Sequence, residues 1–180
     1  MPPEHSAHKD SLIDIVVEIP AGSRNKYEWD PEKKVMRLDR RLFSATVYPA
    51  DYGFIPKTLG EDGDALDAMV LVEDPTYPGI WVRGRPVGVF WMSDEHGPDA
   101  KIICMPEWDY MLPGVEELDD LPSHLLNEIE HFFDVYKDLE PNKHALTDGY
   151  SGRAEAQRLI VEARQRYWDT PDHKGFDETS

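Results

Sequence analysis

Three aspartates stand close together in the segment Asp62-Gly63-Asp64-Ala65-Leu66-Asp67. In an extended chain Asp62 and Asp64 point to the same side, and Gly63 permits a bend that brings Asp67 towards them. Carboxylates held this close repel one another unless a cation lies between them, and oxygen-only ligands favour Mg²⁺, Mn²⁺ or Ca²⁺ over zinc. The segment therefore suggests a divalent-cation site, although an Asp-Gly-Asp turn taken alone is more often a solvated hairpin tip.

An EF-hand loop beginning at Asp62 is excluded. Glu73 would stand correctly at its twelfth position, but Asp67 occupies the sixth, where the sharp turn of that loop requires glycine. An EF-hand also needs flanking helices, whereas the surrounding residues indicate strands.

A second acidic pair, Asp94 and Asp99, flanks the turn residues 95–98. A hairpin there sets the two carboxylates nearly opposite each other, which is unfavourable unless a cation offsets the repulsion. Lys101 follows on the same strand face as Asp99, so a cation site beside a phosphate-binding lysine explains all three, and an ordinary polar turn explains them equally well. Glu18 and Glu28, each on an expected strand, are further candidate ligands, although each taken alone reads as a solvated carboxylate.

Basic and aromatic side chains complete the set of candidates. Together with the acids they suggest a site in which metal ions and cationic side chains hold one polyanion from several sides. Tyrosine hydroxyls add hydrogen-bond donors, or the rings are simply core aromatics with a polar tip. His96 receives no chemical role. The candidates are Lys26, Arg40, Lys101, Lys137 and Lys143, with Tyr48, Tyr52 and Tyr136.

Strands precede helices along the chain. Residues 12–19 alternate at period two, and further strands are expected near 26–30 and 35–40 and over 67–73, 80–93 and 100–105, with a bend at Pro86 and Gly88. Helical spacing of apolar residues predicts helices over 122–137 and about 151–168, the second capped by Ser151. This order predicts an α+β fold in which a small antiparallel barrel carries helices outside.

Length and composition fit one globular domain. We expect a single domain over residues 12–168 between a flexible N-terminus (1–11) and a flexible tail (169–180) of the 180-residue chain. The net charge of −17 disfavours nucleic acid and anionic membranes as partners, and no apolar run approaches the ~20 residues of a membrane span. The one cysteine, Cys104, reads as a buried apolar residue in a cytoplasmic protein with no signal peptide.

Several segments, in sequence order, resemble the motifs of the family I soluble inorganic pyrophosphatases. The resemblance covers about residues 12 to 168, and the Asp94-Glu95-His96-Gly97 form is most similar to actinobacterial members. The matching segments are Asp62–Asp67, Val17–Pro20, Lys26–Glu28, Asp39–Arg40, Tyr48–Pro49 through Tyr52–Ile55, Arg85–Gly88, Asp94–Glu95 with Asp99–Lys101, and His131–Phe133 with Tyr136–Glu140.

The resemblance implies an OB-like five-stranded barrel with flanking helices, a hexameric assembly, and roughly three or four Mg²⁺ ions per site, with Mn²⁺ as a possible substitute. It implies that Asp62, Asp67 and Asp99 hold the first metal, that Asp67 helps the second, and that Asp94 and Asp99 hold a third. Glu28 then lies near a fourth metal, and Glu18 acts through water. The implied phosphate ligands, with Tyr52 in support, are Lys26, Arg40, Lys101, Tyr136, Lys137 and Lys143.

The implied reaction is hydrolysis of inorganic pyrophosphate to two orthophosphates by a metal-activated water. Asp64, in the middle of the acidic segment, is predicted to orient that water and accept its proton. Three residues depart from the family pattern: Ala65 stands in place of proline, Leu146 in place of lysine and His144 in place of an aromatic residue. Two other readings stay open, a non-catalytic OB-type binding module and a metal-dependent phosphohydrolase acting on nucleotides.

Overall fold

The computed structural model describes residues 11–108 and 112–171. The predicted flexible ends fall mostly outside these residues. Strands and helices follow in the order β1 (Ile13–Ile19), β2 (Asn25–Asp30), β3 (Val35–Arg41), β4 (Asp51–Phe54), β5 (Asp67–Val70), β6 (Trp81–Asp94), β7 (Gly97–Pro106), a short 3₁₀ helix η2 (Leu118–Asp120), α1 (Ser123–Val135), β8 (Ala145–Gly152) and α2 (Arg153–Asp169).

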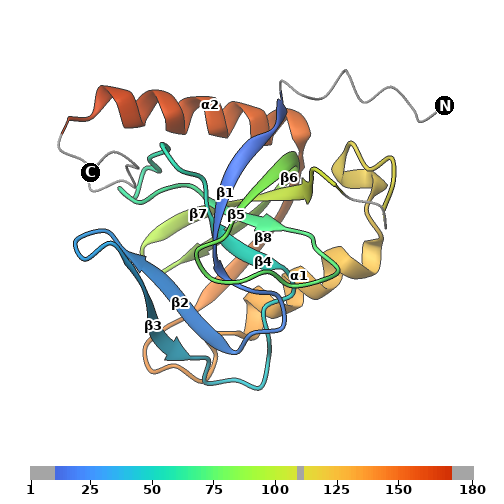
Figure 1. Cartoon of the computed structure of the whole chain (residues 1–180). Helices are drawn as coiled ribbons and strands as arrows, with labels where there is room; N and C mark the ends of the chain where they lie inside the picture. Colours follow the sequence, from blue (N-terminus) through green and yellow to red (C-terminus); the bar gives the residue numbers. More distant parts are fainter. Residues whose placement is uncertain (1–10, 109–111, 172–180) are drawn as a thin grey trace.

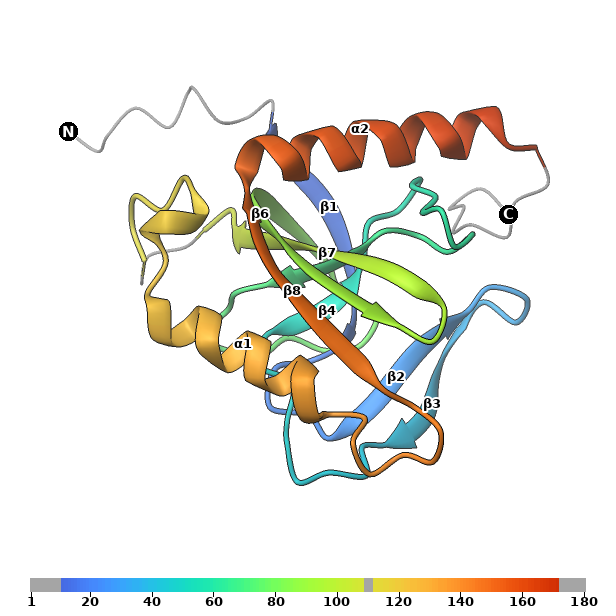
Figure 2. The ribbon, with the colours of Figure 1, turned by 180° about the vertical axis from the view of Figure 1, so that it is seen from behind.

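Five strands close into a barrel in the order β1-β4-β5-β7-β6, because β6 pairs again with β1. Neighbouring strands are antiparallel except for β5 and β7, which run parallel with Asp67 opposite Lys101. The eighth strand, β8, extends the sheet by pairing with the free side of β6, along which it runs in Figure 2. The predicted α+β fold with an OB-like five-stranded barrel is confirmed, and the parallel pair is the one departure from an antiparallel arrangement.

The long strand β6 bends where the sequence predicted it. Its register with β7 shifts between Pro86 and Gly88. The part of β6 before the shift also pairs with β1, and the part after it also pairs with β8. A Cβ atom at Gly88 would lie 2.7 Å from the Leu118 side chain and 2.9 Å from the Ser151 carbonyl oxygen. Glycine is therefore required here by the close approach of η2 and β8, and the bend lets one strand pair with β1, β7 and β8.

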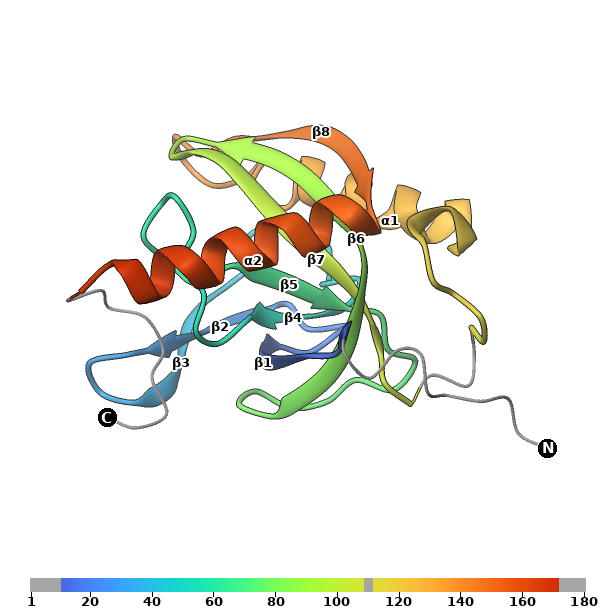
Figure 3. The ribbon, with the colours of Figure 1, turned by 90° about the horizontal axis from the view of Figure 1, so that it is seen from above.

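Alternating side chains of the barrel strands supply two hydrophobic clusters. Ala68 and Val70 of β5 belong to one cluster, whereas Met69 between them belongs to the other, as expected for period-two geometry. Helix α2 packs Ala156, Ile160 and Ala163 against the first cluster and lies across β6 and β7 in Figure 3. The second cluster is completed by α1, whose apolar residues there are Ile129, Phe132 and Phe133.

Strands β2 and β3 form a separate two-stranded hairpin that projects from the barrel (Figure 1). The register pairs Lys26 with Arg40 and Glu28 with Arg37. Because Lys26, Glu28 and Arg40 are all candidate site residues, the hairpin brings one wall of the site to the barrel.

The structure also contains two strands that the sequence did not predict, β4 and β8. Ser151 is not a helix cap but lies in β8, where its Oγ accepts a hydrogen bond of 2.8 Å from Trp91 Nε1, and α2 begins only at Arg153. Strand β4 has only four residues, the residues of β8 are half-buried or exposed, and each strand contains glycine. Neither strand therefore shows the apolar alternation that marks β1. Within the described residues, no helix is long and apolar enough to cross a membrane.

Candidate active site

Three neighbouring strands bring Tyr52, Asp67 and Lys101 together. Tyr52 is on β4, Asp67 begins β5, and Lys101 stands opposite Asp67 on β7. Asp99 precedes Lys101 by two residues and therefore lies on the same face of β7. Strand pairing, and no local turn, thus assembles the centre of the site.

Lys101 is the centre of this hydrogen-bonded cluster. Its Nζ donates to Asp99 Oδ2 at 2.8 Å, to Asp67 Oδ2 at 3.0 Å and to Tyr52 Oη at 2.8 Å. The Tyr52 hydroxyl donates in turn to Asp67 Oδ2 at 2.6 Å. The ammonium also lies 5.5 Å from the centre of the Phe133 ring, a residue of α1. All four polar groups are therefore held in one arrangement around a single positive charge.

Burial and charge act against each other on these groups. Only 2% of the Lys101 side chain is exposed, and burial alone would lower its pKa, but Asp67 and Asp99 raise the pKa above the ordinary lysine value. Burial raises the pKa of Asp99, and the nearby Asp67 carboxylate adds to the rise although Lys101 opposes it. The cluster therefore has more negative charge than its one ammonium balances, which favours a further cation.

A second ion pair lies where α1 ends. Lys137 Nζ donates to Asp94 Oδ2 at 2.9 Å and stands 5.4 Å from the centre of the Tyr136 ring. This pair, with a backbone bond from His96 to Asp94, lowers the pKa of Asp94 despite the opposing effect of its burial. Burial raises the pKa of Tyr136, and the carboxylates of Asp99 and Asp94 raise it further. Tyr136 and Lys137 thus lie beside the acidic cluster, and their role as phosphate ligands stays a prediction.

The hairpin contributes a third group. Lys26 Nζ lies 3.3 Å from both Glu28 Oε2 and Asp39 Oδ2, and Arg40 also pairs with Asp39. Arg40 further contacts Glu140, which Lys143 approaches to 3.1 Å. No role was predicted for Asp39 or Glu140, although both stand inside segments that resemble the family motifs.

Glu18 connects the barrel to this hairpin. Its Oε1 accepts a bond of 2.8 Å from the Trp29 backbone N–H. Burial raises the pKa of Glu18 to about 7, even though this bond favours the charged form, and the charge of Asp67 adds to the rise. A carboxylate at the end of β1 is thus held between the barrel and the hairpin.

The Asp62–Asp67 segment forms a tight turn before β5. Asp62 Oδ1 accepts a bond of 3.0 Å from the Asp64 backbone N–H, and Gly63 adopts a φ of 89°, which residues with a side chain rarely adopt. Partial burial raises the pKa of Asp64, and Asp62 and Asp67 raise it further. The turn places Asp64 within electrostatic reach of the cluster while its side chain stays accessible to water.

The acidic donors fit a hard divalent cation in chemical type. In residues 11–108 and 112–171, no three acidic, histidine or cysteine side chains stand close enough together, as placed, to hold a metal ion. Asp67 and Asp99 nevertheless both direct an oxygen at one cation, Lys101 Nζ, and each of the other candidate acids also offers only oxygen. The full metal-ligand set therefore stays a prediction from the sequence, and Asp67 with Asp99 is its best-assembled part.

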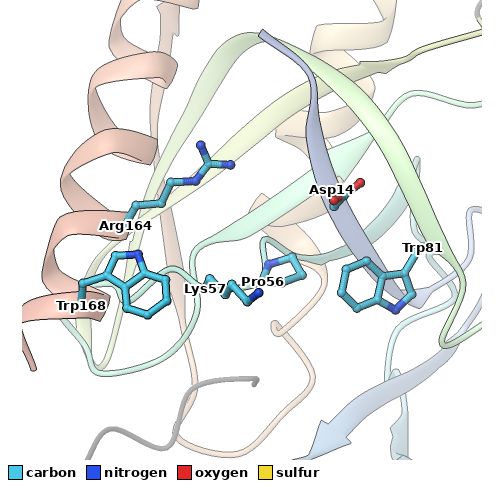
Figure 4. A pocket seen from close by; sticks show the side chains of 6 residues that line it. All are labelled: Asp14, Pro56, Lys57, Trp81, Arg164 and Trp168. Atoms are coloured by element: carbon cyan, nitrogen blue, oxygen red, sulfur yellow. The ribbon is translucent and has the colours of Figure 1, made fainter. Parts of the chain in front are cut away.

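The surface of the described residues includes a hollow at the hairpin and another beside α2. One of about 360 Å³ is lined by hairpin residues that include Glu28 and Asp39, and it adjoins the third group. The other, of about 240 Å³, lies beneath α2 between Trp81 and Trp168, with Lys57, Pro56, Asp14 and Arg164 around it (Figure 4). The candidate site residues line only the first of these hollows.

Comparison with known proteins decides the family. The model of the inorganic pyrophosphatase family matches residues 15–168. The chain belongs to this family. An inorganic pyrophosphatase of Methanosarcina acetivorans is 51% identical over 153 residues, covering 85% of this chain and 90% of that protein. The Streptomyces coelicolor inorganic pyrophosphatase is 50% identical over 165 residues, covering 89% of this chain and 99% of the relative.

Solved structures of inorganic pyrophosphatases share the fold. The structure from Helicobacter pylori superposes with a TM-score of 0.86 at 41% identity and covers 90% of this chain and 96% of its own. The structure from Thermus thermophilus gives the same TM-score and identity, covering 93% of this chain and 97% of its own. The family and fold that the sequence motifs suggested are thus confirmed, while the roles of individual residues stay predictions.

Proposed function

We propose that this pyrophosphatase-family chain hydrolyses inorganic pyrophosphate to two orthophosphates. Membership of the family supports the reaction, and neither rival, a non-catalytic binding module or a nucleotide phosphohydrolase, is favoured. The observation that carries the proposal is the convergence of Asp67 and Asp99 on one buried ammonium, at 3.0 and 2.8 Å. Acidic side chains that could hold metal ions and a cationic side chain that could bind phosphate meet there, as catalysis of phosphoryl transfer requires.

The family is metal-dependent, and we propose Mg²⁺ as the metal, with roughly three or four ions per site. Asp67 and Asp99 would hold the ions at the centre, with Asp62 and Asp94 beside them and Glu18 and Glu28 at the hairpin side. When bound, such ions lower the pKa of a coordinated water towards neutrality and screen the charge of the substrate.

Asp64 is the proposed general base. Its side chain is exposed, so a water can approach it, and the turn at Gly63 keeps it beside Asp62 and Asp67. The raised pKa of Asp64 suits a group that accepts a proton in the reaction. In this scheme Asp64 orients the attacking water and removes its proton as the water adds to one phosphorus.

The cationic side chains would bind and orient the phosphate groups. Lys101 reaches the acidic cluster from β7, and Tyr52 fixes it there. The leaving phosphate would be held by Arg40 and Lys137, which neutralise the charge that accumulates on it, and by a hydrogen bond from the Tyr136 hydroxyl. Lys26 and Lys143 extend this basic wall around the hairpin side of the site.

We also propose that the chain forms a homo-oligomer, a hexamer by resemblance, in the cytoplasm. Several large apolar side chains are exposed, with Tyr77 at 74% and Trp168 at 70%, which supports further burial between copies. Sedimentation velocity tests the assembly directly, and a monomer at micromolar concentration would contradict it.

The decisive experiment measures phosphate release from pyrophosphate with and without Mg²⁺. We expect Mg²⁺-dependent release that Asp67→Asn nearly abolishes, because the amide keeps the shape of the side chain but loses its charge. The matched control is Asp134→Asn, since Asp134 accepts a bond of 2.8 Å from Thr147 on a surface away from the cluster. ATP in place of pyrophosphate, and a gel shift with single-stranded DNA, test the two rivals. Full activity of Asp67→Asn would refute the metal assignment.

A further inference from the structure

Glu140 is a buried carboxylate that binds Arg40, a candidate substrate-binding residue from a distant part of the sequence. Arg40 Nε donates to Glu140 Oε1 at 2.9 Å, and Arg40 Nη2 donates to Glu140 Oε2 at 3.1 Å. This two-pronged contact joins residues that are 100 positions apart, one on the hairpin and one after α1. Only 2% of the Glu140 side chain is exposed, so the carboxylate cannot move aside into water.

A second cation shares the same carboxylate. Lys143 Nζ lies 3.1 Å from Glu140 Oε2. Burial opposes ionisation, yet Lys143 and Arg40 together lower the pKa of Glu140, so it is charged at neutral pH. With Glu140 these two cations leave one positive charge, which Asp39 balances through Arg40 and which a phosphate group could balance in its place.

The two-pronged contact between Arg40 and Glu140, called the fork below, determines which edge of the Arg40 guanidinium can bind a ligand. Because Nε and Nη2 are engaged by Glu140, the guanidinium plane is fixed and Nη1 lies at the opposite edge. Nη1 there donates to Asp39, whose side chain is 30% exposed and also lies near Lys26. A phosphate oxygen can replace the more exposed Asp39 at this edge without breaking the buried fork.

We propose that Glu140 is a positioning residue for pyrophosphate binding, acting through Arg40 without touching the substrate. This inference rests on the proposed function. The alternative is that the fork only fastens the hairpin to the segment after α1. The two differ in their readout: positioning raises KM for pyrophosphate when Glu140 is lost, whereas fastening alone lowers the free energy of unfolding and leaves KM unchanged.

The first test is Glu140→Gln, which keeps the size of the side chain and one acceptor oxygen but loses the charge. We expect kcat/KM for pyrophosphate to fall about 10- to 100-fold, chiefly through a higher KM, as for a modestly misplaced binding group. The control is Glu155→Gln on α2, because Glu155 makes the same kind of fork with Arg158, at 2.9 and 2.6 Å, away from the site. That control should leave both KM and kcat unchanged.

A double-mutant cycle tests whether Glu140 acts through Arg40. In an Arg40→Gln background, Glu140→Gln should cost less than about 3-fold in kcat/KM, since the group that it orients is already gone. Glu140→Asp, which keeps the charge but shortens the reach, should give an intermediate KM and serves as the second variant if Glu140→Gln does not fold. An unchanged KM for both Glu140 variants, or a full loss repeated in the Arg40→Gln background, would overturn the proposal. An inactive unaltered chain would instead overturn the proposed function.

Discussion

Replacing Tyr52 by phenylalanine removes one hydroxyl from the centre of the site and keeps the ring. The hydroxyl donates to Asp67 Oδ2 at 2.6 Å and accepts from Lys101 Nζ at 2.8 Å. The ring centre lies 5.5 Å from that of Tyr48 and 6.2 Å from that of Phe133, and these contacts survive the change. The substitution therefore tests the polar network without opening a large cavity.

The expected loss of stability in Tyr52→Phe depends on which contacts persist after the hydroxyl is removed. Hydrogen bonds to charged partners contribute about 1.5–3 kcal/mol each, so two such bonds set an upper limit of about 6 kcal/mol. The direct contact of 3.0 Å between Lys101 and Asp67 persists and offsets much of this loss. We expect unfolding free energy to fall by about 2–3 kcal/mol. Because Asp67 and Lys101 both lose a partner that aligns them, kcat/KM should fall at least about 10-fold.

Urea unfolding and phosphate release measure the two effects separately. The matched control is Tyr150→Phe, because the Tyr150 hydroxyl also makes a hydrogen bond of 2.6 Å, to the Leu126 carbonyl, but lies outside the site. That variant should lose about 1 kcal/mol of stability and keep its kinetic constants. If Tyr52→Phe matches the control in both measurements, the network around Lys101 has no part in catalysis and the reasoning fails.

Two further predictions concern buried carboxylates. Asp51 accepts bonds from the Ala21 N–H and from both the N–H and hydroxyl of Thr76, so Asp51→Ala should lower unfolding free energy by about 2–4 kcal/mol in a urea titration. An equally stable variant would show that water replaces these bonds. Glu140 has a pKa below its ordinary value of 4.5, so its stabilising effect is present above about pH 4.5 and is lost as pH falls through the lowered pKa. The stability difference between the unaltered chain and Glu140→Gln should therefore shrink in acid, and a difference independent of pH between 3 and 7 (roughly the window set by the shift) would contradict the assignment.

Local patterns in the sequence were sufficient for the strongest elements. Alternation predicted β1 with the bounds 12–19 against the observed 13–19, and Pro86 with Gly88 predicted the bend in β6. Both signals are local, because period-two burial and the loss of a backbone donor act within a few residues. Strands β4 and β8 were not predicted. Strand β4 is only four residues long, and β8 is stabilised by its pairing with β6 more than by the strand propensity of its own residues.

The candidate site also has one part that the sequence predicts and another that only the structure shows. The sequence by itself determined which side chains are available: an Asp-rich turn at Asp62–Asp67, a hairpin with Asp94 and Asp99, and basic residues in an otherwise acidic chain. Composition and spacing carry this information, because oxygen ligands and cations are chosen by residue type.

Only the tertiary structure decided which of these groups meet. The parallel pairing of β5 and β7 sets Asp67 opposite Lys101, and the approach of β3 to the segment after α1 gives Arg40 its contact with Glu140. Neither contact has a local signal, since their partners lie 34 and 100 residues apart and are brought together only by the folding of the whole chain. The residue types are thus fixed by local chemistry, whereas their partners are fixed by how the whole chain buries its apolar surface.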